Sequence, residues 1–330
     1  MRCLVTGARG FVMSVLVQEL LSAEPDALVT ALDLHDPDDA FAAYLAGHGD
    51  RVRHLRADVA DPEAVAEAVA TSAPDVIVHG ATVTHDAATE LSDPARFVRV
   101  NVDGTANVLD AARRTDGVRR VLLLSSGAVY GDSPERSLPE DAATAPDEMY
   151  GISKVAGELV ARRFARLYGL DVPIVRLTKV FGPMERLSSG RAVMSLPYHL
   201  AAAAVHGRPA RLTERTLAAG GDWLSAPEAV RALRLLARGE GSGSGTYNIS
   251  SGVRTGVPEL LQLFGVEALT VPAAEADADM DPATEYGKNG VYPSDKARRE
   301  LSWKPSALAD QIAEYTAWAR RNPGFFEAAR

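Results

Sequence analysis

Short apolar runs alternate with amphipathic segments along most of the chain. Runs that are nearly all apolar, with no period-2 alternation, occur at residues 2–6, 27–32, 52–57, 75–79, 118–124 and 172–177. Such runs are typical of strands covered by helices on both faces of a sheet. Apolar positions at helical spacing follow at residues 11–21, 62–70, 93–114 and 149–168. This alternation predicts an α/β fold with a doubly wound parallel sheet, whose ligand lies at the carboxyl ends of the strands.

The pattern changes after residue 183, where the alternation weakens. A helix is expected at residues 227–238, a further strand at 246–249, and a mostly helical region at 254–330. We therefore expect a sheet domain of residues 1–180 plus about 222–250. The smaller domain is expected to comprise about 181–221 plus 251–330.

Two stretches of biased composition, 239–245 and 274–281, are each interpreted as a loop, although each also suggests a more specific role. The Gly–Ser run at 239–245 is interpreted as a loop that leads into the next strand, with an interdomain linker as the alternative. Carboxylates at 274–281 suggest a metal site, but they lack the spacing of a calcium loop. We therefore expect a solvated loop there and no metal.

Charge and cysteine content exclude several classes of partner. The net charge is −9, and the arginines occur in scattered pairs instead of one basic stripe. This argues against nucleic acid and against an anionic membrane surface. No apolar stretch approaches the roughly 20 residues that cross a bilayer, and the first expected strand leaves no room for a signal peptide. The one cysteine, Cys3, permits no intrachain disulfide, so we expect a cytoplasmic protein.

A pair of glycines, Gly7 and Gly10, separates the first strand from the first helix. Glycine allows the tight turn and the close approach of a pyrophosphate to backbone N–H groups, although an ordinary strand-to-helix turn also uses glycine. The turn predicts dinucleotide contacts from these two glycines and from Arg9, Phe11 and Val12.

Two carboxylates follow the second and third strands. Asp33 is placed to accept hydrogen bonds from ribose hydroxyls and to repel a 2′-phosphate, which favours NAD over NADP, while Arg9 weakens that preference. Asp58 is placed to meet the adenine, with a helix N-cap as the alternative.

Tyr150 and Lys154 lie four residues apart on an expected helix, so both project from one face. A nearby ammonium and a positive nicotinamide ring are expected to favour the phenolate, which makes Tyr150 a candidate base. Ser126 ends the fifth strand, where its hydroxyl is placed to donate to the reacting oxygen; a turn or helix cap is the alternative.

Several motifs together resemble one family. They are Thr6-Gly7-x-x-Gly10-Phe11, Asn101-Val102-x-Gly104-Thr105-x-Asn107, Ser125-Ser126-x-x-Val129-Tyr130-Gly131, Tyr150-Gly151-x-Ser153-Lys154 with Gly157-Glu158, Arg176 with Gly182-Pro183, and a C-terminal segment from Asp295 to Pro305. The chain resembles the extended short-chain dehydrogenase/reductases, the NAD-dependent sugar epimerase/dehydratase family, over nearly its whole length. The resemblance implies a Rossmann-type sheet domain that binds NAD, a smaller substrate-binding domain, and a homodimer formed through the helices at 94–114 and 149–168.

The resemblance also implies site residues that spacing alone does not. Further cofactor contacts are expected at Val59, Gly80, Ala81, Thr82, Asn101, Leu124, Leu177 and Val180. Substrate contacts are expected at Thr84, His85, Ser126, Gly127 and Lys179. The catalytic set is Ser126, Tyr150 and Lys154.

Four departures from the family pattern bear on function. Met13 stands where a third glycine is usual, which predicts a displaced helix or a looser cofactor. Nucleotide-sugar enzymes usually carry asparagine at Lys179 and arginine at Gly221, and both contact the nucleotide diphosphate in relatives. Lys179 instead offers a point charge to a carboxylate or phosphate, or extends to the surface. Gly127-Ala128 replaces the acidic pair of the dehydratases, which disfavours dehydration.

These features predict an NAD-dependent oxidoreductase that acts at a carbinol of a sugar or sugar acid, as an epimerase or a dehydrogenase. A nucleotide-sugar 4-epimerase is the alternative within the family. The alternative from another class is a non-catalytic NAD(P)-binding regulator, which Met13 favours and the intact catalytic residues disfavour.

Overall fold

A computed structural model describes residues 1–133, 136–188, 190–277, 280 and 290–329. At its centre is a seven-stranded parallel sheet with the order β10-β6-β5-β4-β1-β2-β3. Its strands are β1 (Arg2–Thr6), β2 (Leu28–Asp33), β3 (Val52–Arg56), β4 (Val76–His79), β5 (Arg120–Ser126), β6 (Ile174–Leu177) and β10 (Thr246–Ile249). The strand order reverses beside β1, and a ligand crevice forms at such a switch point.

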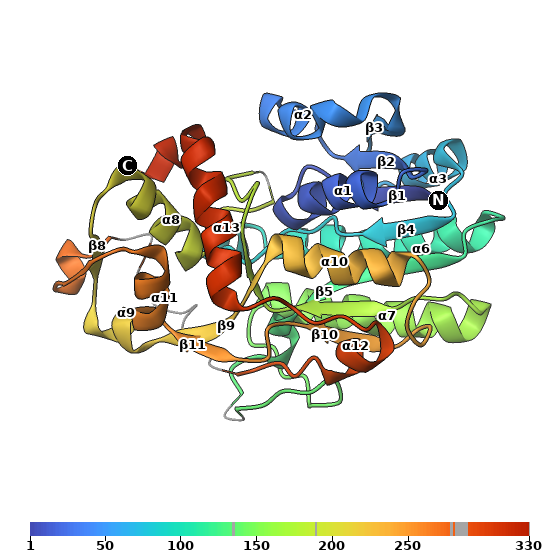
Figure 1. Cartoon of the computed structure of the whole chain (residues 1–330). Helices are drawn as coiled ribbons and strands as arrows, with labels where there is room; N and C mark the ends of the chain where they lie inside the picture. Colours follow the sequence, from blue (N-terminus) through green and yellow to red (C-terminus); the bar gives the residue numbers. More distant parts are fainter. Residues whose placement is uncertain (134–135, 189, 278–279, 281–289, 330) are drawn as a thin grey trace.

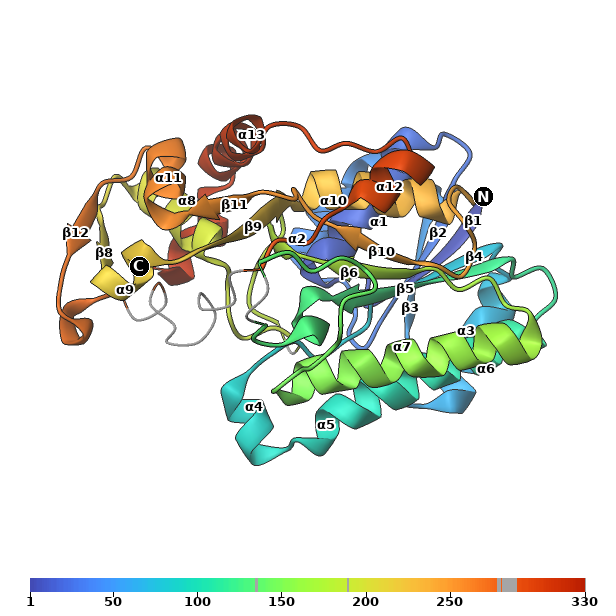
Figure 2. The same ribbon diagram turned by 90° about the horizontal axis from the view of Figure 1, so that it is seen from below.

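Helices cover both faces of this sheet (Figures 1 and 2). One face carries α1 (Phe11–Ala23) and α10 (Ala226–Ala237), which pack against each other. The other face carries α3 (Pro62–Ser72), α6 (Gly104–Arg114) and α7 (Met149–Tyr168), side by side. Apart from the edge strand β3, whose sequence Val-Arg-His-Leu-Arg is largely exposed, the strands are buried because both faces are covered, which explains their nearly continuous apolar sequence. The predicted doubly wound α/β fold is confirmed.

The helical segment expected at 93–114 is interrupted. The structure has α4 (Ala87–Ser92), α5 (Ala95–Phe97) and a π-helical segment at Val98–Asp103 before α6 begins. A π-helical turn shifts the side chains that follow it, and such turns are frequent at functional sites. The buried side chain of Asn101 lies in this turn.

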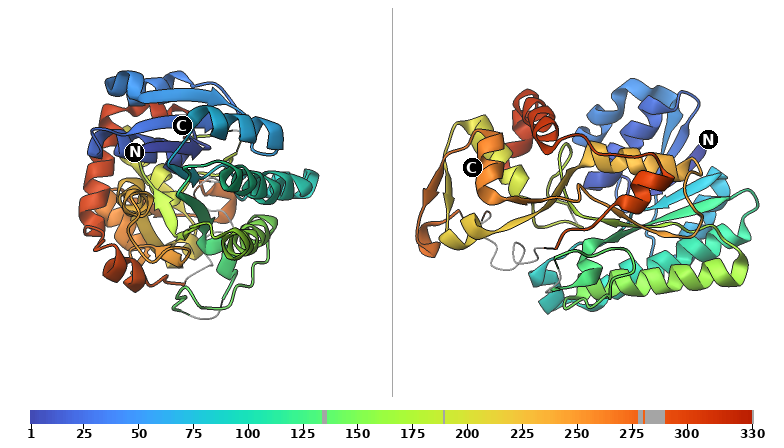
Figure 3. Two further views of the ribbon diagram at one scale, coloured as in Figure 1. Left: turned by 90° about the vertical axis from the view of Figure 1, so that its right-hand side faces the viewer. Right: turned by 60° about the horizontal axis from the view of Figure 1, so that its bottom comes forward.

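A smaller region lies at one end of the sheet, where the chain crosses repeatedly after β6 (Figure 3). Its strands form a three-stranded sheet, β11-β9-β7, and a two-stranded one, β12-β8. These strands are β7 (Lys179–Phe181), β8 (Ala210–Leu212), β9 (Gly220–Ser225), β11 (Arg254–Gly256) and β12 (Ala268–Thr270). Its helices are α8 (Leu196–His206), α9 (Glu214–Ala218), α11 (Val257–Phe264) and α13 (Leu308–Arg321).

The smaller region has an apolar cluster of its own, which includes Phe181, Trp223, Leu260 and Tyr315. The sequence did not predict its three-residue strands, because so short a run carries no readable period. Residues 239–245 lead directly from α10 into β10 of the central sheet, as the loop interpretation predicted.

The two remaining α-helices of the described residues are short. The helix α2 (Asp39–Leu45) follows β2, and α12 (Asp295–Glu300) packs near β10. Of the acidic stretch 274–281, residues Ala274–Asp277 and Met280 are described, whereas 278, 279 and 281 lie outside the described residues. Among the described helices, none combines the length and the apolar content that crossing a bilayer requires.

Candidate active site

A cavity of about 1360 Å³ runs along the carboxyl ends of the parallel strands and into the smaller region. Nearly all residues that the sequence predicted for the site line this one cavity. They are Gly7, Arg9, Gly10, Phe11, Val12, Asp33, Asp58, Val59, Gly80, Ala81, Thr82, Thr84, His85, Leu124, Ser126, Gly127, Tyr150, Lys154, Leu177, Lys179 and Val180. The structure thus brings the predicted cofactor, substrate and catalytic residues together.

The turn between β1 and α1 fits a pyrophosphate. Gly7 has a φ of +68°, and a Cβ there would lie 2.7 Å from the Cα of Ala81. A Cβ on Gly10 would lie 2.9 Å from the carbonyl oxygen of Gly7. Gly10 also provides no side-chain cap for α1, so the first N–H groups of the helix stay available to an anion. Both glycines therefore leave room for the phosphates to approach the backbone.

Met13 packs against Gly80 at the start of the first helix. Its buried side chain fills the space beside Gly80, where an added Cβ would lie only 2.3 Å from the Met13 Sδ. Gly80 directly follows β4, so its missing side chain leaves room for the Met13 side chain on α1. The small residue at 80 thus compensates for the large one at 13, while the expected displacement of the helix or loosening of the cofactor stays a prediction.

The carboxylates at the adenosine end differ in their roles. Asp33 Oδ2 accepts a hydrogen bond from the backbone N–H of Arg9 at 3.0 Å, which ties the end of β2 to the glycine turn. Asp58 lines the cavity and accepts a bond from the backbone N–H of Ala60, whereas the N-cap of α3 is Asp61. The alternative interpretation of Asp58 as that cap is therefore wrong.

Asn101 is the exception among the predicted contacts, because it lies behind the cavity wall instead of lining it. Its side-chain oxygen accepts from the N–H of Val83 at 2.8 Å and from the Thr82 hydroxyl at 3.0 Å. Its amide donates to Ser153 at 2.9 Å, one residue before Lys154. Asn101 thus joins the loop after β4 to α7. The sequence pattern could not distinguish this role from a cofactor contact.

The proposed catalytic side chains converge where β5 meets α7. The Ser126 hydroxyl lies close enough to the Tyr150 phenol to lower its pKa, and it accepts a hydrogen bond from the N–H of Ala128 at 3.1 Å. It therefore caps the short helix at 127–130 and faces Tyr150 at the same time. The Lys154 ammonium lies 5.7 Å from the centre of the Tyr150 ring and donates to the carbonyl of Leu124 at 3.0 Å.

The electrostatics of this group differ from the expectation. Burial raises the pKa of Tyr150 above its ordinary value, while the neighbouring Ser126 hydroxyl and the charge of Arg191 act in the opposite direction. Burial also lowers the pKa of Lys154 to about 8, against the attraction of Glu158. In the chain alone, burial outweighs the stabilisation of the phenolate that the lysine was expected to provide.

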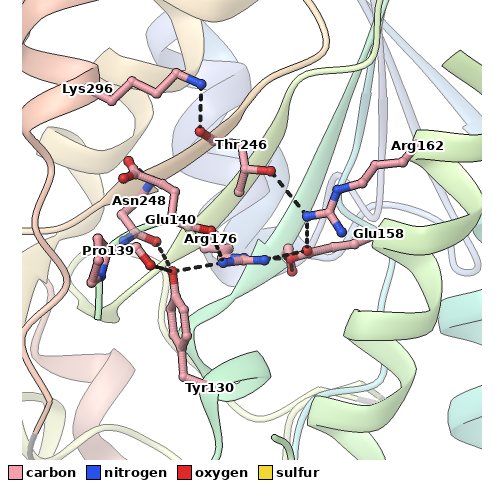
Figure 4. A network of polar contacts seen from close by, with 10 residues as sticks. Tyr130, Pro139, Glu140, Glu158, Arg162, Arg176, Thr246, Asn248 and Lys296 are labelled. Atoms are coloured by element: carbon pink, nitrogen blue, oxygen red, sulfur yellow. Dashed lines mark hydrogen bonds and ion pairs between the residues drawn. The ribbon is translucent and has the colours of Figure 1, made fainter. Parts of the chain in front are cut away.

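A buried network stands behind the catalytic helix (Figure 4). Glu158, one turn after Lys154, accepts from Arg176 through both carboxylate oxygens, at 2.9 and 2.7 Å. Arg176 also donates to the Tyr130 hydroxyl at 2.9 Å, and that hydroxyl bonds to Asn248 at 2.8 Å. The network therefore connects α7, β6, β10 and the segment after Ser126, and it fixes their relative positions.

The substrate end is formed by side chains from distant segments. The Thr84 hydroxyl donates to the carbonyl of Gly190 at 2.8 Å, and His85 Nδ1 lies 2.6 Å from a Glu148 carboxylate oxygen. The Lys179 ammonium lies 5.5 Å from the centre of the Trp223 ring. A Cβ on Gly221 would lie 2.9 Å from the Lys179 Cδ, so the small residue at 221 makes room for the long one at 179.

Sequence reasoning missed several cavity residues, among them Asp38, Arg186, Arg191, Trp223 and Tyr292. Tyr292 stacks on Tyr130, with ring centres 5.4 Å apart, and a Cβ on Gly127 would lie 2.8 Å from its ring. Arg191 stands over the Phe11 ring at 5.4 Å. The one available signal for Tyr292 was its position just before the C-terminal motif at Asp295.

Comparisons with known proteins agree with this geometry. The model of the NAD dependent epimerase/dehydratase family matches residues 3–250. The chain is 33% identical to a dTDP-glucose 4,6-dehydratase of Streptomyces griseus, over 98% of this chain and 95% of that protein. It is 30% identical to a UDP-glucose 4-epimerase of Mycolicibacterium smegmatis, over 97% and 99% of the two chains.

Solved structures show the same architecture. A dTDP-glucose 4,6-dehydratase of Streptomyces venezuelae, solved with NAD bound, superposes with a TM-score of 0.80 at 28% identity over the full length of both chains. A UDP-glucose 4-epimerase of Thermotoga maritima superposes with a TM-score of 0.81 at 21% identity, over 98% and 100% of the two chains, which shows the shared fold. This chain belongs to the NAD-dependent epimerase/dehydratase family and is an NAD-dependent enzyme.

Proposed function

We propose that this enzyme oxidises a carbinol of a sugar or sugar-acid substrate, with Tyr150 as the base. The observation that carries the proposal is the convergence of Ser126 and Tyr150 in the wall of the large cavity, with Lys154 one turn further along α7. Bound NAD supplies the acceptor for a hydride. The residues Gly7, Gly10 and Asp33 would hold its pyrophosphate and ribose.

Ser126 and Tyr150 have different roles in the proposed reaction. The Ser126 hydroxyl donates to the reacting oxygen and keeps it beside the phenol. Tyr150 takes the carbinol proton as the hydride leaves the same carbon, so that a carbonyl forms. A buried phenol needs a positive neighbourhood for this step: the charge of Arg191 lowers the pKa of Tyr150, and the Lys154 ammonium lies 5.7 Å from the centre of its ring. No acid or base follows Ser126 at positions 127 and 128, which argues against a dehydratase.

Whether the enzyme is an epimerase or a dehydrogenase depends on what happens to the hydride. An epimerase returns it to the opposite face and retains its cofactor, whereas a dehydrogenase releases NADH. The relatives include nucleotide-sugar epimerases, so a nucleotide-sugar 4-epimerase is the second candidate. The regulator is not favoured, because Met13, its one supporting feature, fits against Gly80.

One experiment tests the reaction and its class together. The purified enzyme is incubated with NAD and a panel of uronic acids, aldonic acids and nucleotide sugars. NADH formation is followed by absorbance, and product stereochemistry by NMR. Net NADH identifies a dehydrogenase. Inverted product with NAD still bound, and released only on denaturation, identifies an epimerase. No reaction with any member of the panel would contradict the proposal.

The remaining assignments concern organisation. The seven-stranded sheet with its helices forms the NAD-binding domain, and the cluster around Trp223 forms most of the substrate-binding domain, which the separate apolar clusters support. We also assign a cytoplasmic location, since the single thiol, Cys3, is free and buried.

A homodimer is supported by apolar side chains on the outer face of α7. Ile152, Leu159 and Leu167 are 44%, 59% and 50% exposed and recur at helical spacing, with Val98 exposed nearby. A second copy of the chain covers this stripe in our proposal. Light scattering should give twice the mass of one chain, and Leu159→Glu should give a monomer; a monomeric wild-type protein would exclude the dimer.

A further inference from the structure

Two arginines from distant parts of the chain meet at one carboxylate, Asp38. Arg9 belongs to the glycine turn, and its Nη2 donates to Asp38 Oδ2 at 2.8 Å. Arg186 follows β7, and its Nη2 donates to both oxygens of Asp38, at 3.1 and 3.0 Å. All three side chains line the cavity. The carboxylate therefore neutralises one of two guanidinium charges and occupies donors of both.

This cluster adjoins the carboxylate that selects the ribose. Asp33 accepts the backbone N–H of Arg9, the same residue whose side chain is held by Asp38. In dinucleotide-binding folds a carboxylate at the end of β2 accepts the 2′-hydroxyl of NAD, and a nearby arginine accommodates the 2′-phosphate of NADP. This chain has the carboxylate and also has two arginines, which are directed to Asp38.

A purely structural role for Asp38 explains only part of its surroundings. Asp38 caps α2 by accepting the N–H of Phe41 at 2.8 Å. Asparagine caps a helix about as well as aspartate, so the cap does not require a charge. Arg9 also retains a buried Nε that has no hydrogen-bond partner among the described residues. The guanidinium is therefore not fully used by the protein, and a donor remains beside the cavity.

We propose that Asp38 is a cofactor-selecting residue, which holds Arg9 and Arg186 away from the 2′-phosphate of NADP and so makes this site specific for NAD. A phosphate monoester carries a charge of about −1.5 to −2 at pH 7, so it is repelled by a second carboxylate beside Asp33. Without the charge of Asp38, two guanidinium groups become available as the planar donors that bind phosphate well.

The test is a competition between the two cofactors that requires no substrate. The wild-type enzyme, Asp38→Asn and Asp39→Asn are each brought to equilibrium by dialysis against equal concentrations of NAD and NADP, and the bound dinucleotides are quantified by chromatography. Asp38→Asn preserves the helix cap. Asp39→Asn removes the same charge from the next residue, which is exposed, and serves as the matched control.

We expect the wild-type protein and Asp39→Asn to bind mainly NAD. In Asp38→Asn the ratio of bound NADP to bound NAD should rise about tenfold, which corresponds to about 1.4 kcal/mol. Adding Arg186→Met to Asp38→Asn should remove most of that gain, and the gain should shrink as salt is raised.

Three results would overturn the inference: an unchanged ratio in Asp38→Asn, an equal rise in Asp39→Asn, or equal binding of both cofactors by the wild-type protein. Because the readout is binding, it stands apart from the assignment of the reaction. An enzyme inactive on every sugar tested would still show the shift in cofactor preference.

Discussion

The cofactor end and the substrate end of the cavity are built in different ways. The cofactor end depends on backbone and on absent side chains: Gly7, Gly10 and Gly80 each occupy a place where a Cβ would collide with a neighbour. The substrate end depends on long side chains, such as Lys179, Arg191 and Tyr292, that come from distant segments. The first design fixes the shape of the turn that faces the pyrophosphate, whereas the second can be altered residue by residue without disturbing the sheet.

Tyr150 lies where the cofactor end and the substrate end meet. Its substitution should give the largest effect on activity, and it should separate the rate of the reaction from the affinity for NAD. Tyr150→Phe should lower the rate of hydride transfer about 10³-fold, because proton removal is lost, while the affinity for NAD stays the same. Stopped-flow NADH formation and equilibrium dialysis measure the two quantities. Tyr168→Phe, on the exposed end of α7, is the control and should react normally. An active Tyr150→Phe enzyme would assign the base elsewhere.

The buried ion pair between Arg176 and Glu158 tests how much a side-chain network behind α7 contributes to stability. Arg176→Met leaves the Glu158 carboxylate buried with fewer donors, which should lower the free energy of unfolding by about 3–5 kcal/mol. Urea unfolding measures the loss. The comparison variant Arg113→Met breaks the partly exposed pair with Asp110 on α6 and should cost less than about 1 kcal/mol. Equal losses of unfolding free energy in the two variants would show that the buried network contributes no more to stability than a partly exposed ion pair.

Lys154 lines the cavity beside Tyr150, and its burial predicts that the free energy of unfolding depends on pH. Its pKa is lowered by burial from 10.5 to about 8, so between these values the folded chain binds fewer protons than the unfolded chain. Stability relative to Lys154→Met should therefore rise by about 3 kcal/mol from pH 8 to pH 10.5. Urea unfolding at both pH values tests this, with the exposed Lys304→Met as control. A flat difference would mean that Lys154 titrates normally.

The smallest expected effect concerns the packing of Gly80 against Met13 at the cofactor end. Gly80→Ala introduces a Cβ against the Met13 side chain and should cost about 1–3 kcal/mol in unfolding free energy. Met13→Ala in the same chain should recover most of that cost. A double-mutant cycle measured by urea unfolding gives the coupling. Additive costs would show that the two residues do not compensate.

The sequence predicted those parts of the molecule that short-range patterns encode. The sheet strands, the glycine turn and the spacing of Tyr150 and Lys154 depend on residues close together in the chain. The partnership of Asp38 with Arg186, and of Tyr292 with Gly127, depends on how distant segments pass one another, which no local pattern records. The same reason explains Asn101, whose motif was readable while its position behind the wall was not.

The pairing of Met13 with Gly80 restricts how this chain can change over time. A larger residue at 80 is tolerated only after a smaller one has appeared at 13, and a smaller residue at 13 alone leaves an empty space in the core. Neither step is neutral by itself, so the order of substitutions matters. An unusual residue in a familiar glycine turn can therefore persist through its dependence on a second position, without any gain in cofactor binding.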